Sequence, residues 1–100
     1  MLSQQNISAN TPNGGNLVEG GATFRVFAPR ATAVYLNGNF ADAVYDQQTD
    51  DRLLSKDATG YWTAFQAGAQ DGDQYQFWVA GTGSNVIGSA GGVAKAGVLS

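Results

Sequence analysis

The sequence predicts an all-β sandwich, and three observations support this fold class. Short runs rich in aromatic and β-branched residues alternate between apolar and polar positions, which is the period of a half-buried strand. Turn-forming residues, including many of the 14 glycines, separate these runs. No stretch carries the periodicity of a helix of useful length. One hundred residues with 43% apolar and 13% charged side chains suit a single globular domain with one modest core.

Residues 1–21 are expected to form a flexible N-terminal arm. This segment is rich in Asn, Gln, Ser, Thr and Gly and holds only isolated apolar residues such as Ile7 and Leu17. Its start lacks both a basic region and an apolar stretch of roughly 7 to 15 residues, so the pattern does not indicate a secretory signal. Nothing further along the chain approaches the length of a membrane span.

Two strands are predicted after this arm. In residues 22–28, Phe24 and Val26 alternate with polar residues, and Pro29 ends the run because it cannot donate a hydrogen bond to a neighbouring strand. Residues 33–40 repeat the alternation until glycine interrupts it. Each strand therefore has one face suited to a core.

A long polar connection and a hairpin are predicted next. Residues 41–60 are polar and rich in aspartate, and we expect only one short strand, near Leu53. Residues 61–67 and 73–80 have strand composition, and residues 68–72 between them have turn chemistry. These two strands are predicted to pair as a hairpin.

The core of the sandwich is expected to span residues 22–83. Residues 84–100 are rich in Gly and Ala, and their apolar residues keep no steady period. They are predicted to form a C-terminal edge strand or a tail that belongs to the same single domain.

The residues that most enzymes use for catalysis are absent or badly placed. The chain has no His and no Cys, and its single glutamate, Glu19, lies in the expected arm. The closest carboxylate pairs, at residues 50–51 and at Asp71 and Asp73, fall in predicted loops, where no apolar pocket would raise one pKa. Calcium needs about six to eight oxygen ligands, and further donors do not follow at loop spacing. We therefore predict no catalytic residue, no metal site and no cofactor.

Charge and composition also argue against nucleic-acid and membrane partners. The net charge is −3 and the basic residues are dispersed, so no stripe could neutralise a phosphate backbone. The five basic residues are Arg25, Arg30, Arg52, Lys56 and Lys95. The lack of cysteine is compatible with a cytoplasmic location, which is the localisation we predict.

Sugar binding needs fewer special residues, and the chain offers candidates for it. An exposed aromatic ring can stack on a pyranose ring while amides reach the hydroxyl groups. Trp78 and Gln76 share the strand face opposite Tyr75 and Phe77, and we expect Phe65 of the neighbouring strand to lie beside them. The alternative for Trp78 is a role in the core, which is also the expected role of Trp62.

Three ordered motifs give the chain a resemblance to a known domain. It resembles the amino-terminal β-sandwich of glycogen branching enzymes and other glycoside hydrolase family 13 α-glucan enzymes, grouped with the family 48 carbohydrate-binding modules. The motifs are Phe-Arg-Val-Phe-Ala-Pro at 24–29, Val-x-Leu-x-Gly-x-Phe at 34–40, and Gly-Tyr-Trp at 60–62 leading to Asp-Gly-Asp-x-Tyr-x-Phe at 71–77. The resemblance implies an immunoglobulin-like β-sandwich of the E-set type. It also implies a domain without catalytic residues that precedes a catalytic (β/α)₈ barrel and packs beside it or positions α-glucans.

The chain departs from the glucan-binding members of this family at three positions, one of which is the loop after the last motif, where their usual tryptophan has no counterpart around residues 81–83. Those members follow the Gly-x-Phe element with Asn and Trp, whereas Phe40 is followed by Ala41 and Asp42. Their basic residue between the Tyr and Phe of the last motif is replaced by Gln76.

The sequence therefore leads to one main functional hypothesis and two alternatives. The main hypothesis is a non-catalytic accessory domain of an α-glucan enzyme, most similar to a branching enzyme. Its partners would be the catalytic barrel and an α-glucan oligosaccharide. The first alternative is an autonomous glycogen- or starch-binding module whose platform is Trp78 with Gln76 and Phe65. The second is an immunoglobulin-like domain used for protein contact, because such folds host many functions.

Overall fold

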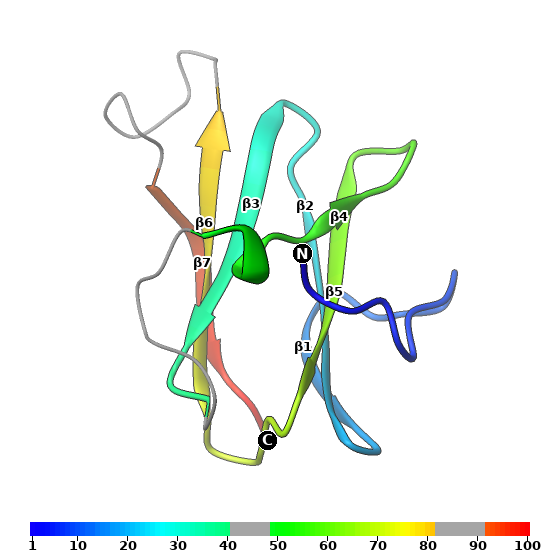
Figure 1. Cartoon of the computed structure of the whole chain (residues 1–100), viewed down its shortest axis with the longest axis vertical. Helices are drawn as coiled ribbons and strands as arrows, with labels where there is room; N and C mark the ends of the chain where they lie inside the picture. The colour runs from blue at the N-terminus through cyan, green and yellow to red at the C-terminus, as the bar shows by residue number, and fades with distance from the viewer. Residues whose placement is uncertain (41–48, 82–91) are drawn as a thin grey trace.

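The computed structural model describes residues 1–40, 49–81 and 92–100, and this part of the chain is built almost entirely of strands (Figure 1). They are β1 (Gly14–Val18), β2 (Gly21–Phe27), β3 (Ala31–Gly38), β4 (Ser55–Lys56), β5 (Tyr61–Ala67), β6 (Gln74–Gly81) and β7 (Gly92–Val98). One short 3₁₀ helix, η1 (Asp50–Arg52), precedes β4. None of the helical structure in these ranges has the length or apolar character needed to cross a bilayer.

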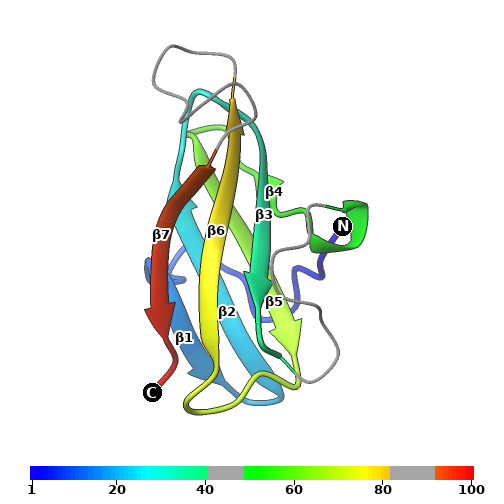
Figure 2. The same cartoon turned by 90° about the vertical axis from the view of Figure 1, so that its left-hand side faces the viewer.

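The strands form two antiparallel sheets that pack face to face. The four-stranded sheet has the order β1-β2-β5-β4, and the three-stranded sheet has the order β3-β6-β7. Figure 2 views the three-stranded sheet from its outer side, with the four-stranded sheet behind it. Lettered along the chain, these orders are ABED and CFG, which is the arrangement of constant-type immunoglobulin domains. The predicted all-β, immunoglobulin-like sandwich is confirmed.

The core is centred on Phe24, which is fully buried between the sheets. Its ring meets Phe40, Tyr75 and Phe77 edge to face, with centroid distances of 5.8, 5.0 and 6.2 Å. Such pairs contribute about 0.5–1.5 kcal/mol each beyond the area they bury. Trp62 also belongs to this core, as predicted: it is 6% exposed and its indole N–H donates to the Ala28 carbonyl at 2.9 Å.

The predicted hairpin of residues 61–67 and 73–80 is wrong. Both strands exist, but β5 pairs with β2 and β4, whereas β6 pairs with β3 and β7 in the other sheet. The loop between them crosses from one sheet to the other. Its two ends are held apart because the Gly68 amide donates to Gly20 and the Gly72 amide donates to Leu99. The apolar faces of β5 and β6 can then point into the core from opposite sheets.

The expectation of an arm over residues 1–21 is corrected within this segment. Gly14–Val18 forms β1, which pairs along its whole length with β2. Ser3 bridges to Phe65 of β5, and the amide of Leu2 donates to the Leu53 carbonyl at 2.9 Å. The first residues therefore extend the four-stranded sheet beside β4, as Figure 1 shows at the N-terminus.

The segment before β4 ties the two sheets together at one edge. Leu53 bridges to Tyr35, and the amide of Leu54 donates to the Val34 carbonyl at 2.8 Å, so this segment follows the free edge of β3. The predicted short strand lies just beyond Leu53, as β4.

Residues 41–48 lie outside the described part of the chain. At the opposite edge of the same sheet, β7 is the C-terminal edge strand, and residues 82–91 before it also lie outside that part.

Candidate functional site

The strongest candidate surface is the outer face of the three-stranded sheet around Trp78. Along β6, Tyr75 and Phe77 point inward and are buried, whereas Gln76 and Trp78 alternate to the outer face and are partly exposed. On β3, Tyr35 lies directly opposite Trp78 in the antiparallel register. We call Trp78, Tyr35 and Gln76 the aromatic face.

The geometry of the aromatic face suits an uncharged, flat ligand. Residues directly opposite in an antiparallel pair have Cβ atoms about 4.5–5.5 Å apart, so the side chains of Trp78 and Tyr35 are neighbours. An indole ring offers a wide apolar surface, and the Tyr hydroxyl and Gln amide can both donate and accept hydrogen bonds. Trp78, Tyr35 and Gln76 carry no formal charge at neutral pH, so they can bind hydroxyl groups but do not attract an ion.

Tyr35 is the residue of this face that the sequence analysis did not select. The alternation in residues 33–40 already places Tyr35 on the face opposite Val34 and Leu36. The sequence did not show that β3 pairs with β6, and this pairing places Tyr35 opposite Trp78.

Phe65, the third predicted member of the platform, does not belong to it. It lies on β5 in the other sheet and is only 3% exposed. The N-terminal segment covers it: Ser3 pairs with it and accepts a hydrogen bond from its amide at 2.8 Å. One cause of this error is the wrong hairpin, since β5 and β6 are not neighbours. The other is that Phe65 is covered by the N-terminal segment, whose Ser3 lies 62 positions earlier in the chain.

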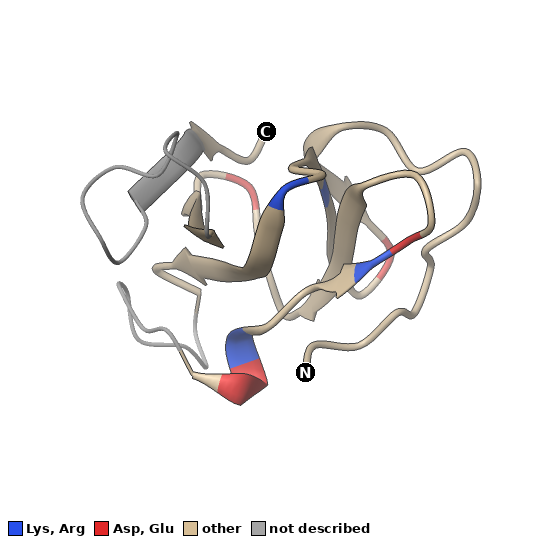
Figure 3. Cartoon of the chain, turned by 90° about the horizontal axis from the view of Figure 1, so that it is seen from above, with Lys and Arg blue, Asp and Glu red and all other residues tan. Residues whose placement is uncertain are grey.

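Two of the described aspartates, Asp51 and Asp73, accept local hydrogen bonds. The Thr49 hydroxyl donates to Asp51 at 2.8 Å at the start of η1 and lowers the pKa of this carboxyl. Figure 3 marks the acidic residues of η1 and of the loops in red. The side chain of Asp73 accepts the Gln70 amide at 2.9 Å within the β5–β6 loop. In the three described ranges, no group of three His, Cys, Asp or Glu residues is placed to hold a metal ion.

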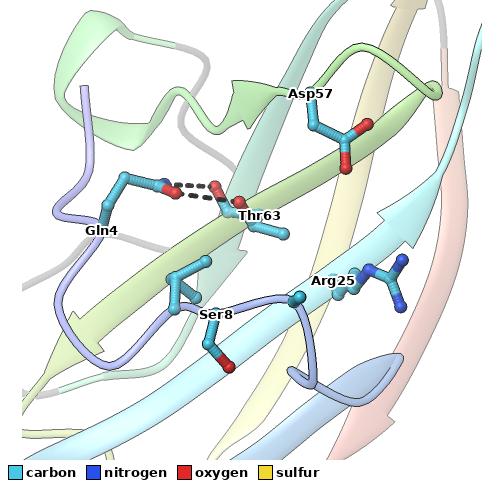
Figure 4. A pocket seen from close by; sticks show the side chains of 7 residues that line it. Gln4, Ser8, Arg25, Asp57 and Thr63 are labelled. Atoms are coloured by element: carbon cyan, nitrogen blue, oxygen red, sulfur yellow. Dashed lines mark hydrogen bonds between the residues drawn. The ribbon is translucent and has the colours of Figure 1, made fainter.

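A pocket of about 400 Å³ lies on the opposite side of the sandwich, between the N-terminal segment and the outer face of the four-stranded sheet (Figure 4). Arg25 of β2 and Thr63 of β5 belong to the sheet, whereas Gln4 and Ser8 come from the N-terminal segment. This pocket was not anticipated from the sequence, because nothing in residues 1–13 shows that they fold over these strands.

Comparison with known protein families shows to which family of domains this chain belongs. The family described as carbohydrate-binding module 48 (isoamylase N-terminal domain) matches residues 11–94, which is most of the chain. The chain belongs to carbohydrate-binding module family 48. As a family 48 module it is an accessory, non-catalytic domain of the kind found in glycoside hydrolase family 13 enzymes, and the predicted resemblance is confirmed.

Solved structures with a similar fold are pullulanases. PulA from Klebsiella oxytoca is 27% identical over 70% of this chain, with a TM-score of 0.55. The maltotriose complex of PulA from Klebsiella pneumoniae gives the same three values. The pullulanase from Bacillus acidopullulyticus is 23% identical over 77% of the chain, with a TM-score of 0.59, and supports the fold alone. No curated protein matches the chain.

The family 48 module accounts for only a small part of each of these enzymes. The chain spans 6%, 7% and 9% of the three pullulanase chains. The similar structures are pullulanases, so the narrower prediction of a branching enzyme stays a prediction.

Proposed function

We propose that this family 48 module places α-glucan chains through its aromatic face for a larger α-glucan-acting enzyme, of the branching-enzyme or pullulanase type. The observation that carries the proposal is Trp78, which is partly exposed on an outer sheet surface with Tyr35 opposite it and Gln76 on the same strand face. The family supports sugar as the ligand. The similar structures support α-glucans, because one is a maltotriose complex of a pullulanase.

The residues of the aromatic face set the expected strength of binding. A hydrogen bond to a charged group contributes about 1.5–3 kcal/mol, whereas a neutral one contributes about 0.5–1.5 kcal/mol. Gln76 is neutral, where glucan-binding members of the family carry a cation. We therefore expect weak, millimolar binding that depends mainly on stacking against the Trp78 ring.

Titration with maltoheptaose and β-cyclodextrin tests the proposal. Tryptophan fluorescence and the chemical shift of the Trp78 indole should change saturably in the wild-type chain. Trp78→Ala should weaken binding at least about fivefold, because aromatic stacking is worth on the order of 1 kcal/mol or more. Phe27→Ala is the matched control, since Phe27 is 56% exposed on the other sheet and should leave binding unchanged. Equal affinity in the wild type and Trp78→Ala would remove the aromatic face as the site.

Packing against a catalytic barrel is the second part of the proposal, and Phe27 is the side chain that supports it. Its ring is exposed at the end of β2 and lies 4.8 Å from the Tyr61 ring. Exposed aromatic side chains are enriched in contact surfaces between proteins. Labelling of Phe27 by hydroxyl radicals should fall when the chain is part of the longer enzyme. Unchanged labelling would leave sugar placement as the function and exclude this contact.

A further inference from the structure

The pocket under the N-terminal segment is a concave surface lined mainly by polar residues. Its floor is the outer face of β2 and β5, and Figure 4 shows Arg25 and Asp57 on one side with Gln4 and Ser8 on the other. One rim is fixed by a reciprocal pair: the Gln4 amide donates to the Thr63 carbonyl at 2.8 Å, and the Thr63 hydroxyl donates to the Gln4 amide oxygen at 3.0 Å.

The guanidinium of Arg25 is held in place before any ligand arrives. It stacks 3.7 Å from the centroid of the Tyr61 ring and donates from Nη1 to the Thr11 carbonyl at 3.3 Å. A guanidinium has five N–H donors, and this is the one hydrogen bond that Arg25 makes to the described residues. The remaining N–H donors of Arg25 are therefore available to a ligand. Because the guanidinium is already held in place, the Arg25 side chain loses little conformational entropy when a ligand binds.

Asp57 offers a fixed acceptor at the same pocket. One of its oxygens, Oδ1, accepts the Thr59 hydroxyl at 2.8 Å, the Thr59 amide at 2.8 Å and the Tyr61 amide at 3.1 Å. The Thr59 hydroxyl also lowers the pKa of Asp57, so the carboxylate is ionised at neutral pH. The other oxygen, Oδ2, accepts none of these three hydrogen bonds.

These two charges select the class of ligand. Arg25 and Asp57 are the only charged residues of the pocket lining, so its net charge is zero. A simple anion or cation gains little here, because the attraction of one of these charges is offset by the repulsion of the other. A neutral polyol avoids both penalties, because each hydroxyl group can accept from Arg25 and donate to Asp57.

We propose that this pocket binds one pyranose ring of an α-glucan, as a second sugar site on the sheet opposite the aromatic face. The choice of α-glucan among neutral sugars rests on the proposed function, whereas the pocket itself does not depend on Trp78. A module with sites on both outer faces can hold two glucan chains at once, or two branches of one molecule.

Nuclear magnetic resonance with the whole chain and maltose tests the second site. The amide signals of Ser8 and Thr63 should shift saturably at millimolar maltose. Arg25→Gln should weaken the affinity for maltose, measured from these shifts, at least about tenfold, since hydrogen bonds from a charged donor are lost. Ala9→Phe is a second variant, which fills the pocket without removing any of its polar groups. Trp78→Ala should leave the Ser8 and Thr63 shifts unchanged.

The outcomes separate this inference from the proposed function. Saturable shifts at Trp78 with none at Ser8 and Thr63 would overturn the pocket and leave the aromatic face in place. Shifts at Ser8 and Thr63 that survive both Arg25→Gln and Ala9→Phe would also overturn it. Glycine, a zwitterion, is the comparison ligand: a response to glycine without one to maltose would make this a zwitterion site and overturn the sugar assignment. No response of either surface to maltose or maltoheptaose would overturn both proposals.

Discussion

Tyr75 shows how single residues join the two sheets. It stands near the start of β6, is 6% exposed, and its hydroxyl oxygen accepts the Gly15 amide of β1 at 3.0 Å. The strands beside it must be free of side chains there. A Cβ on Gly97 would lie 2.6 Å from the Tyr75 hydroxyl oxygen, and one on Gly15 would lie 2.8 Å from the Tyr75 ring. The bulky ring in the three-stranded sheet therefore requires the glycines that face it.

Removing this hydroxyl should cost stability without disturbing the core. Tyr75→Phe keeps the ring but leaves the Gly15 amide without its partner, which is expected to lower the free energy of unfolding by about 1–2 kcal/mol. Tyr61→Phe is the matched control, because the Tyr61 hydroxyl makes no hydrogen bond to the described residues, and its expected effect is within about 0.5 kcal/mol. Urea unfolding followed by tryptophan fluorescence measures both. Equal stability of the two variants would show that the Tyr75 hydroxyl does not hold the sheets together.

At the scale of elements, the sequence predicted the central strands well and the segments at the edges poorly. The alternation of apolar residues placed β2, β3, β5 and β6 within three residues of their observed ends, because these strands have a buried and an exposed face. β1 has little apolar content and becomes a strand only because β2 is beside it. Likewise, the sequence of β5 cannot show that Phe65 is covered, since its cover is the N-terminal segment.

The N-terminal segment should therefore act as part of the core. Phe65→Ala is expected to lower the free energy of unfolding by about 3 kcal/mol, as for a buried Phe that leaves a cavity. Phe27→Ala removes the same side chain from the same sheet face, but at a site that is 56% exposed, and should cost less than about 1 kcal/mol. Thermal unfolding of the two variants gives the comparison. A small effect of Phe65→Ala would mean that the segment does not hold its place over β5.

For the whole molecule, local patterns could not determine which strands pair. Residues 68–72 have the turn chemistry of a hairpin, but the same glycines serve a loop that crosses between sheets, with Gly68 and Gly72 at positive φ angles of 78° and 91°. Burial decides between the two arrangements, because a hairpin would leave the apolar faces of β5 and β6 side by side on one surface. In the sandwich they face each other across Phe24. This crossover also separates the two outer surfaces that we propose as sugar sites.

Two independent sites on one cooperative domain should both stabilise it when sugar binds. Ligand at ten times its dissociation constant raises the free energy of unfolding by about 1.4 kcal/mol per site, which corresponds to roughly 6–11 °C in Tm for a domain of this size. The wild-type chain should show a larger shift than Trp78→Ala or Arg25→Gln, because each substitution weakens one site and distant effects add. The double variant should show the smallest shift. Differential scanning calorimetry with and without maltoheptaose measures each shift against the variant's own baseline. A full-sized shift in either single variant would contradict the independence of the two faces.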